Sequence, residues 1–214
     1  MKKAIIQNLP ALDAAQTEAL NTIITNLLYA KSELKKIIFT SCDCAEDKDA
    51  LLIQLAQALG KQGKKTVLID ADLRQNGVSA LYGMDENEAG LAQYLTNRCE
   101  LSASLHDTDT ANLTLLPAGK KVANSALLLS GEQTETLLKA CAAQFDLVLI
   151  NTSGGFSADE TGSFAPLCDG IVLVARDHLT HSRKLHQTKQ TLEKTGCPVI
   201  GCIVTGVRKP AAYA

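Results

Sequence analysis

Residues 37–50 read Ile37-Ile38-Phe39-Thr40-Ser41-Cys42-Asp43-Cys44-Ala45-Glu46-Asp47-Lys48-Asp49-Ala50. The stretch begins with a short apolar run and leads into the apolar helical pattern of residues 51–59. In a nucleotide-binding α/β protein, a glycine-rich phosphate-binding loop joins strand to helix at this place. Lys48 matches the lysine of such a loop. The stretch contains no glycine, however, and Asp49 stands where a serine or threonine is expected.

The rest of the chain alternates apolar runs of strand type with patterns of helical period, which predicts a doubly wound, mostly parallel α/β sheet with helices on both faces. We expect one domain over residues 1–214, with an N-terminal helical arm (1–35), a core (36–208) and a short tail (209–214). The expected strands are residues 37–39, 66–69, 113–116, 145–150, 170–175 and 199–204. The expected helices are residues 12–30, 51–59, 79–82, 91–95, 132–144, 159–167 and 180–195.

Composition limits the classes of protein to consider. The 214 residues are 46% hydrophobic and carry a net charge of −2, from 21 basic and 23 acidic side chains, which argues against a nucleic-acid partner. We find neither a signal peptide nor a membrane-spanning run and expect a cytoplasmic protein. Most of the seven cysteines are expected to be reduced thiols. Cys42 and Cys44 form a C-x-C pair that could instead serve a metal or redox sensor.

Three polar clusters follow predicted strands: the loop of residues 40–50, Asp70-Ala71-Asp72-Leu73-Arg74, and Asn151-Thr152-Ser153-Gly154-Gly155. Ligands of doubly wound sheets bind at the carboxyl ends of the strands, so we expect the clusters to meet at one edge. Asp70 and Asp72 have the chemistry for Mg²⁺ coordination and for orienting an attacking oxygen, although a solvated turn is the alternative. Arg74 would clamp a phosphate or pair with these acids.

With these residues in view, the chain resembles the bacterial tyrosine kinases of capsule and exopolysaccharide synthesis, whose fold is P-loop NTPase-like. The strongest match is Leu68-Ile69-Asp70-Ala71-Asp72-Leu73-Arg74. Further matches are Gly90-Leu91, Leu116-Pro117-Ala118-Gly119, Ala165-Pro166-Leu167-Cys168-Asp169-Gly170 and Gly206-Val207. Partition and division-site ATPases share the fold class, but they carry a lysine at the position of Asp43.

The resemblance implies ATP or ADP and Mg²⁺ as cofactors, with Asp70 and Asp72 as catalytic carboxylates and Asp49 and Asp70 as metal ligands. It also implies a membrane-anchored polysaccharide chain-length or activator protein as partner, a peripheral position at the inner face of the cell membrane, and a homo- or hetero-oligomer with an active kinase. The nucleotide would contact Ser41, Ala45, Lys48, Asp49, Arg74, Asn151 and Thr205.

Departures from the family pattern lie where the chemistry would be. The family pattern has glycines at Ala45 and Asp47, a hydroxyl at Asp49 and aspartate at Asn151. A carboxylate about 4 Å from a phosphate charge costs roughly 4 kcal/mol at an effective dielectric near 20. We therefore expect a degenerate, non-catalytic relative of these kinases. The alternative is an active kinase that ligates Mg²⁺ through Asp49, Asp70 and Asp72, because Asp49 is itself a hard oxygen donor.

Overall fold

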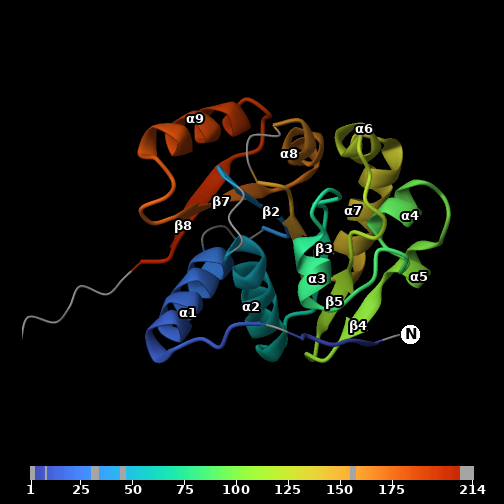
Figure 1. Ribbon diagram of the computed structural model, residues 1–214, viewed down its shortest axis with the longest axis horizontal. Helices are drawn as coiled ribbons and strands as arrows, with labels where there is room; N and C mark the ends of the chain where they lie inside the picture. Colours follow the sequence, from blue (N-terminus) through green and yellow to red (C-terminus); the bar gives the residue numbers. More distant parts are fainter. Residues whose placement is uncertain (1–2, 8, 30–33, 44–46, 155–157, 208–214) are drawn as a thin grey trace, which may run out of the picture.

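The computed structural model describes residues 3–7, 9–29, 34–43, 47–154 and 158–207. Its centre is an eight-stranded sheet in the order β1-β4-β5-β3-β6-β2-β7-β8 (Figure 1). All neighbouring pairs are parallel except β4 with β5, which are antiparallel. The strands are β1 (Lys3–Ala4), β2 (Lys36–Ser41), β3 (Thr66–Asp70), β4 (His106–Thr108), β5 (Leu113–Leu116), β6 (Leu147–Asn151), β7 (Gly170–Arg176) and β8 (Val199–Thr205).

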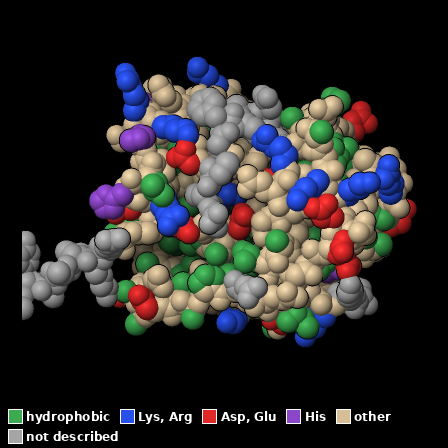
Figure 2. All heavy atoms as spheres, in the orientation of Figure 1, with side chains coloured by type: hydrophobic (Ala, Val, Ile, Leu, Met, Phe, Trp, Pro, Cys, Tyr) green, Lys and Arg blue, Asp and Glu red, His purple; other side chains and the backbone are tan. Residues whose placement is uncertain are grey.

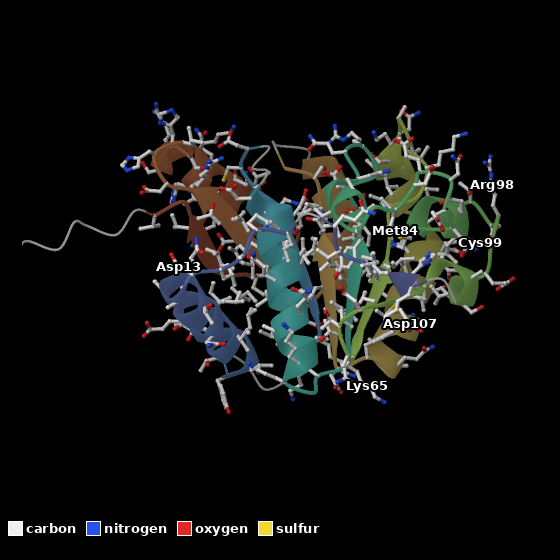
Figure 3. All side chains as sticks on the ribbon, turned by 60° about the horizontal axis from the view of Figure 1, so that its bottom comes forward. Asp13, Lys65, Met84, Arg98, Cys99 and Asp107 are labelled. Carbon is white, nitrogen blue, oxygen red and sulfur yellow. The ribbon has the colours of Figure 1, made fainter. Side chains whose placement is uncertain are left out.

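Helices cover both faces of the sheet, as predicted. They are α1 (Ala14–Tyr29), α2 (Asp47–Lys61), α3 (Gly77–Leu81), α4 (Leu91–Leu95), α5 (Leu101–Ser104), α6 (Ser125–Leu129), α7 (Glu132–Gln144), α8 (Ala158–Phe164), the 3₁₀ turn η1 (Ala165–Leu167) and α9 (Ser182–Glu193). Figure 3, which brings the bottom of Figure 1 forward, shows α1 and α2 in front of the sheet, with Asp13 at the start of α1. There Asp13 and Gln16 form a capping box, with N–H···O distances of 2.9 and 2.7 Å.

Alternation along the central strands divides the core into two halves. Ile37 and Phe39 of β2 belong to the half under α1, α2 and α3, whereas Ile38 between them belongs to the half under α4, α6, α7, η1 and α9. In β3, Leu68 faces the first half, and Val67 and Ile69 face the second. Because both faces are covered, the central strands read as continuous apolar runs instead of alternating ones.

The structure differs from the sequence prediction at the margins of the sheet. Lys3 and Ala4, in the stretch expected to be a helical arm, form the edge strand β1 and pair with β4. Residues 106–108 form β4, the antiparallel strand, which the sequence analysis missed. The short helices α5 and α6 were also missed. The six predicted strands are all present, with ends shifted by no more than two residues.

Candidate functional site

The three polar clusters meet at the carboxyl ends of three adjacent strands. β3, β6 and β2 are neighbours in the sheet, and Asn151 at the end of β6 is the register partner of both Asp70 in β3 and Phe39 in β2. The predicted convergence of the loop after β2, the Asp70–Arg74 segment and the Asn151 segment is therefore confirmed. The doubly wound order produces it, because parallel strands all end at the same edge.

Lys48 lies in the first turn of α2 and points into the protein, where only 3% of the residue is exposed. Its Nζ donates hydrogen bonds to the side-chain oxygen of Asn151, to the carbonyl oxygen of Thr152 at 2.7 Å and to Oδ1 of Asp49 at 3.2 Å. An ammonium group has three protons to donate. These three acceptors match the full donor capacity of Lys48.

Asn151 connects Lys48 to Asp70 through hydrogen bonds. Its Nδ2 donates to Oδ1 of Asp70 at 3.0 Å, while Oδ2 of Asp70 accepts from the backbone N–H of Ser79 at 3.0 Å and from its hydroxyl at 2.8 Å. Asp70 is fully buried. Burial, and then the nearby charge of Asp49, raise the pKa of Asp70 to about 7, against the lowering effect of the hydrogen bonds from Asn151 and Ser79.

Asp72 is held by the turn that follows β3. One of its carboxylate oxygens accepts from the backbone N–H groups of Arg74 at 3.2 Å and Gln75 at 3.0 Å. Burial raises the pKa of Asp72, the turn hydrogen bonds and the charge of Lys48 lower it, and Asp49 raises it again. Arg74 donates through Nη2 to the hydroxyl of Ser153 at 3.3 Å, so the second and third clusters also touch there.

Asp49 occupies space that Gly77 leaves open. A Cβ atom placed on Gly77 would lie 1.9 Å from Oδ2 of Asp49, so this glycine makes room for the carboxylate at the start of α3. Asp47 is turned the other way and forms an ion pair with Nε of Arg176 at 3.2 Å. Asp47 and Asp49 thus both have defined protein contacts.

The remaining loop residues are held by neighbouring elements. Ser41 donates to the carbonyl oxygen of Asp43, whose side chain pairs with Lys184 of α9. Asp43 stands where partition ATPases carry a lysine, so this chain has a negatively charged side chain where those proteins have a positively charged one. Ala45 and Cys44, which the sequence analysis also singled out, lie outside the described residues. Cys42 is buried.

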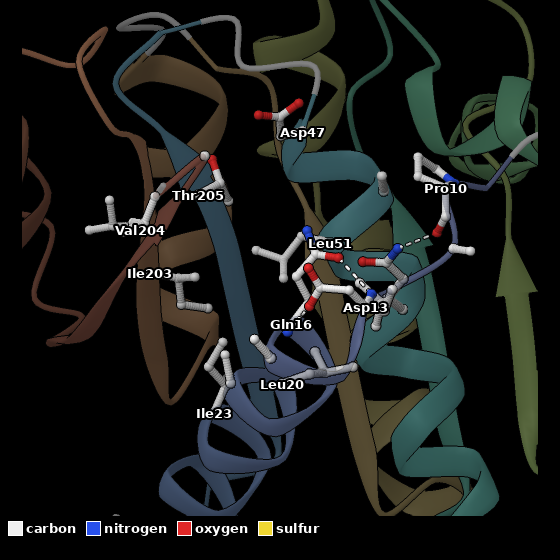
Figure 4. A pocket seen from close by; sticks show the side chains of 18 residues that line it. Pro10, Asp13, Gln16, Leu20, Ile23, Asp47, Leu51, Ile203, Val204 and Thr205 are labelled. Atoms are coloured by element: carbon white, nitrogen blue, oxygen red, sulfur yellow. Dashed lines mark hydrogen bonds between the residues drawn. The ribbon is translucent and has the colours of Figure 1, made fainter. Parts of the chain in front are cut away.

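Thr205 lies away from the Lys48 network, on the wall of a cavity of about 590 Å³ between α1, α2 and β8. Its hydroxyl donates to the carbonyl oxygen of Ala175 at 3.3 Å. Figure 4 shows Thr205 and Asp47 at one end of this cavity, with Ile203 directed toward Leu20 and Ile23 of α1. Most of the lining is apolar, and Figure 2 shows hydrophobic side chains gathered over the same region.

The sequence analysis assigned no site role to Ser79 or to Thr152, which complete the network. Ser79 was expected only as part of a short helix. Its hydroxyl, on α3, donates to Asp70 and also accepts from the N–H of Ala118 at 3.0 Å. Because Asp70 and Ala118 are distant in sequence, no local sequence pattern predicts these contacts. Thr152 contributes a backbone carbonyl, which any residue could supply. Within the described residues, no group of three or more His, Cys, Asp and Glu side chains is arranged to hold a metal ion.

Comparisons with known proteins agree on one class of fold. A model of the AAA domain family matches residues 34–158. The chain is 27% identical over 204 residues to the tyrosine-protein kinase CpsD of Streptococcus pneumoniae, covering 91% of this chain and 90% of that protein. The solved kinase domain of the Escherichia coli tyrosine kinase ETK is 26% identical with a TM-score of 0.85, covering 93% of this chain and 79% of the other.

A more distant structure shares the fold and was solved with a nucleotide. The septum site-determining protein MinD from Pyrococcus horikoshii OT3, complexed with Mg-ADP, is 21% identical with a TM-score of 0.67, covering 79% of this chain and 69% of the other. The sheet is therefore P-loop NTPase-like, as predicted, and nucleotide and Mg²⁺ are ligands within this wider group. Among the described residues, no helix is both long enough and apolar enough to cross a membrane.

Proposed function

The chain belongs to the AAA domain family and is homologous to the bacterial tyrosine kinases of capsule and exopolysaccharide biosynthesis, and from that premise we propose that it is a non-catalytic member of the kinase group. It would serve as a regulator or assembly partner in polysaccharide synthesis. A protein of this kind keeps the kinase scaffold and has lost the chemistry of phosphoryl transfer.

The arrangement of Lys48 carries the proposal. In a phosphate-binding loop the lysine reaches the β and γ phosphates. Here its ammonium group is buried and donates to Asn151, Thr152 and Asp49. A phosphate would have to displace these acceptors, and Asn151 would then lose its charged partner inside the protein. Leaving a buried acceptor unpaired costs about 1–3 kcal/mol.

The carboxylates around Lys48 fit Mg-nucleotide poorly. Asp70 directs both oxygens at Asn151 and Ser79, and Asp72 uses one oxygen to hold its own turn. Asp49 brings a negative charge to the position of the usual metal-binding hydroxyl, beside two further buried acids. Repulsion of roughly 4 kcal/mol between such a carboxylate and a phosphate would lower affinity about a thousandfold.

The homology also supports a proposal about two binding partners, an active kinase and a membrane-anchored protein. A non-catalytic subunit would act by occupying a place beside an active kinase, in a hetero-oligomer or in a homo-oligomer that replaces it. The other partner would be the membrane-anchored chain-length or activator protein, which would bring the chain to the inner face of the membrane. Co-purification of the chain with these proteins from membranes would support this part of the proposal.

One observation favours a second candidate, an active kinase with unusual metal ligation. The charge of Asp49 raises the pKa of both Asp70 and Asp72, so the three carboxylates lie close enough to influence one another. A Mg²⁺ ion drawing all three together would neutralise that repulsion. This candidate requires side-chain rearrangement at Asp49 and Asp70, and it predicts activity that depends on both.

A phosphotyrosine assay separates the two candidates. The purified chain is incubated with Mg²⁺ and ATP, alone and with an active kinase of this group, and phosphotyrosine is measured on both proteins. We expect no transfer by the chain alone and the same background for Lys48→Ala. Transfer that Lys48→Ala and Asp70→Asn each abolish would contradict the proposal and establish the second candidate.

A further inference from the structure

Among the residues that the structure describes, β8 (Val199–Thr205) is the last strand of the sheet and has a neighbouring strand on one side only. In the adjacent strand β7 every residue except Arg176 is buried, whereas no residue of β8 is buried. A Cβ atom placed on Gly201 would meet no atom within 4 Å. Figure 1 shows β8 at the outer margin of the sheet, with α1 toward one face and α9 toward the other.

The backbone of β8 presents hydrogen-bonding groups to the side away from β7. The carbonyl oxygen of Thr205 accepts from the N–H of Asp177 at 2.9 Å, so the peptide groups of Thr205 point toward β7. A register irregularity occurs opposite Ile171 and Val172, and from Gly201 to Thr205 the pairing is regular. Because backbone direction alternates along a strand, Cys202 and Val204 turn their N–H and C=O groups outward.

Side chains do not protect this edge against pairing. Natural edge strands are commonly blunted by lysine, proline or very short length. The opposite edge of the sheet, β1, has two residues, one of them Lys3. β8 is seven residues long and contains neither a charged residue nor proline. The exposed fraction of Val204 reaches 50%.

We propose that β8 pairs antiparallel with β8 of a second copy of this chain, with Ile203 on the two-fold axis. In this register Cys202 lies opposite Val204 of the second copy, so the two outward-facing positions of each regular segment exchange hydrogen bonds with each other. Ile203 lies opposite its own counterpart as a close, non-hydrogen-bonded pair. Apolar and β-branched cross-strand pairs stabilise such an arrangement, and no like charges face each other within the strands.

The symmetry of the β8 pair determines which helices of the two copies lie next to each other. A two-fold axis that relates antiparallel strands runs perpendicular to the sheet, so α1 lies beside its counterpart on one face and α9 beside its counterpart on the other. The cavity between α1 and β8 adjoins this edge, because Ile23 of α1 and Ile203 of β8 both line it (Figure 4). A stable dimer buries roughly 800 Å² per partner, so contacts between the facing helices would have to add to the strand contact.

A second copy is favoured over a strand from another protein because the edge is complementary to itself. In this register the exposed Cys202 and Val204 meet each other and the exposed Gly201 meets Thr205, and the two-fold axis places the two sheets in one continuous layer. The pairing involves no residue of the Lys48 network. A test of the β8 pairing can therefore fail without contradicting the proposed function, and the reverse also holds.

Sedimentation analysis of the full chain at about 5–100 µM tests the pairing. We expect a monomer–dimer equilibrium that Val204→Lys weakens about tenfold or more, since the substitution places two lysines in the symmetric seam. Leu127→Lys is the matched control. Leu127 is 76% exposed and lies on α6, away from β8 (Figure 1), so this variant should dimerise as the wild type does. A monomeric wild type at the highest concentration, or equal dimerisation of all three proteins, would overturn the proposal.

Disulfide mapping tests the register in a Cys202→Ser background. Ile203→Cys places two cysteines opposite each other at the axis, and mild oxidation should join the two copies. Thr205→Cys, which would lie opposite Gly201 of the second copy, should not be joined. A dimer in which Thr205→Cys reacts as readily as Ile203→Cys would exclude the proposed register, and a dimer in which neither reacts would exclude β8 as the interface.

Discussion

The ammonium group of Lys48 directs its three hydrogen bonds to partners within the protein. Asn151, Thr152 and Asp49 accept them, and Asn151 connects the lysine to the buried Asp70. Asn151 can link the two side chains because an amide can accept from a lysine and donate to an aspartate at the same time. These hydrogen bonds join Lys48, Asn151 and Asp70 in one buried network.

Lys48→Met tests the structural role of this lysine. Methionine keeps the length of the side chain and leaves Asn151 and Thr152 without their donor, so the free energy of unfolding should fall by about 2 kcal/mol. Urea denaturation without nucleotide measures it. Lys61→Met, an exposed lysine at the end of the same helix, should change stability by less than about 0.5 kcal/mol. Equal effects of the two substitutions would contradict the network.

Asp70 makes the stability of the fold depend on pH. Burial raises its pKa from 3.8 to about 7, so the folded protein holds a proton that the unfolded chain has released. The stabilisation from this proton is complete below the unfolded pKa and is lost as the pH rises through about 7. Between pH 5.5 and 8 the loss should be about 2 kcal/mol.

Asp70→Asn should remove most of this pH dependence, because asparagine has no proton to lose and can still hydrogen-bond to Ser79. Urea unfolding at pH 5.5 and 8 measures the difference for each protein. Asp107→Asn, a substitution of an exposed aspartate on β4 (Figure 3), controls for the other titrating groups and should retain the slope of the wild type. An unchanged slope in Asp70→Asn would show that Asp70 is ionised throughout this range.

At the scale of elements, the sequence predicted the parts of the fold that have strong periodicity. The central strands are continuous apolar runs because both faces are covered, and α2 and α7 have apolar stripes at helical spacing. β1 and β4 were missed because they are two and three residues long and are defined by pairing with each other. Helices of four or five residues, such as α5 and α6, have too few turns to show a period.

Two segments of the family resemblance meet at the start of α4. The N–H groups of Leu91 and Ala92 donate to the carbonyl oxygens of Pro117 at 2.8 Å and Ala118 at 3.0 Å. A Cβ atom on Gly90 would lie 2.5 Å from the carbonyl oxygen of Pro117 and 2.7 Å from the backbone nitrogen of Gly119. The close approach of the two backbones therefore requires glycine at position 90.

Gly90→Ala should reduce the free energy of unfolding by about 1–3 kcal/mol, since the backbone it meets cannot move aside without breaking the hydrogen bonds of α4. Gly131 offers a matched control at the start of α7, where the nearest atom to an added Cβ lies at 3.5 Å. Gly131→Ala should leave stability nearly unchanged. Thermal unfolding of the two variants beside the wild type compares them, and similar melting temperatures for both would contradict the account.

For the whole molecule, the sequence predicted where the three polar clusters lie but not the contacts between their side chains. Motif order and strand ends located Lys48, Asp70, Asp72 and Asn151 at one edge of the sheet. The partners of these side chains came from segments far apart in the chain, such as Ser79 for Asp70, and the direction of Lys48 depends on all of them together. Thr205, which is expected beside a nucleotide, lines the cavity between α1, α2 and β8, and its role stays a prediction.

The central claim is that the scaffold of the kinase group persists without its nucleotide chemistry. Calorimetric titration with ATP and Mg²⁺ of the wild type, beside a variant with Ala45→Gly, Asp47→Gly, Asp49→Thr and Asn151→Asp, tests it most directly. The account predicts no measurable binding to the wild type at millimolar ATP and clear binding to the restored variant. Micromolar binding to the wild type would contradict it.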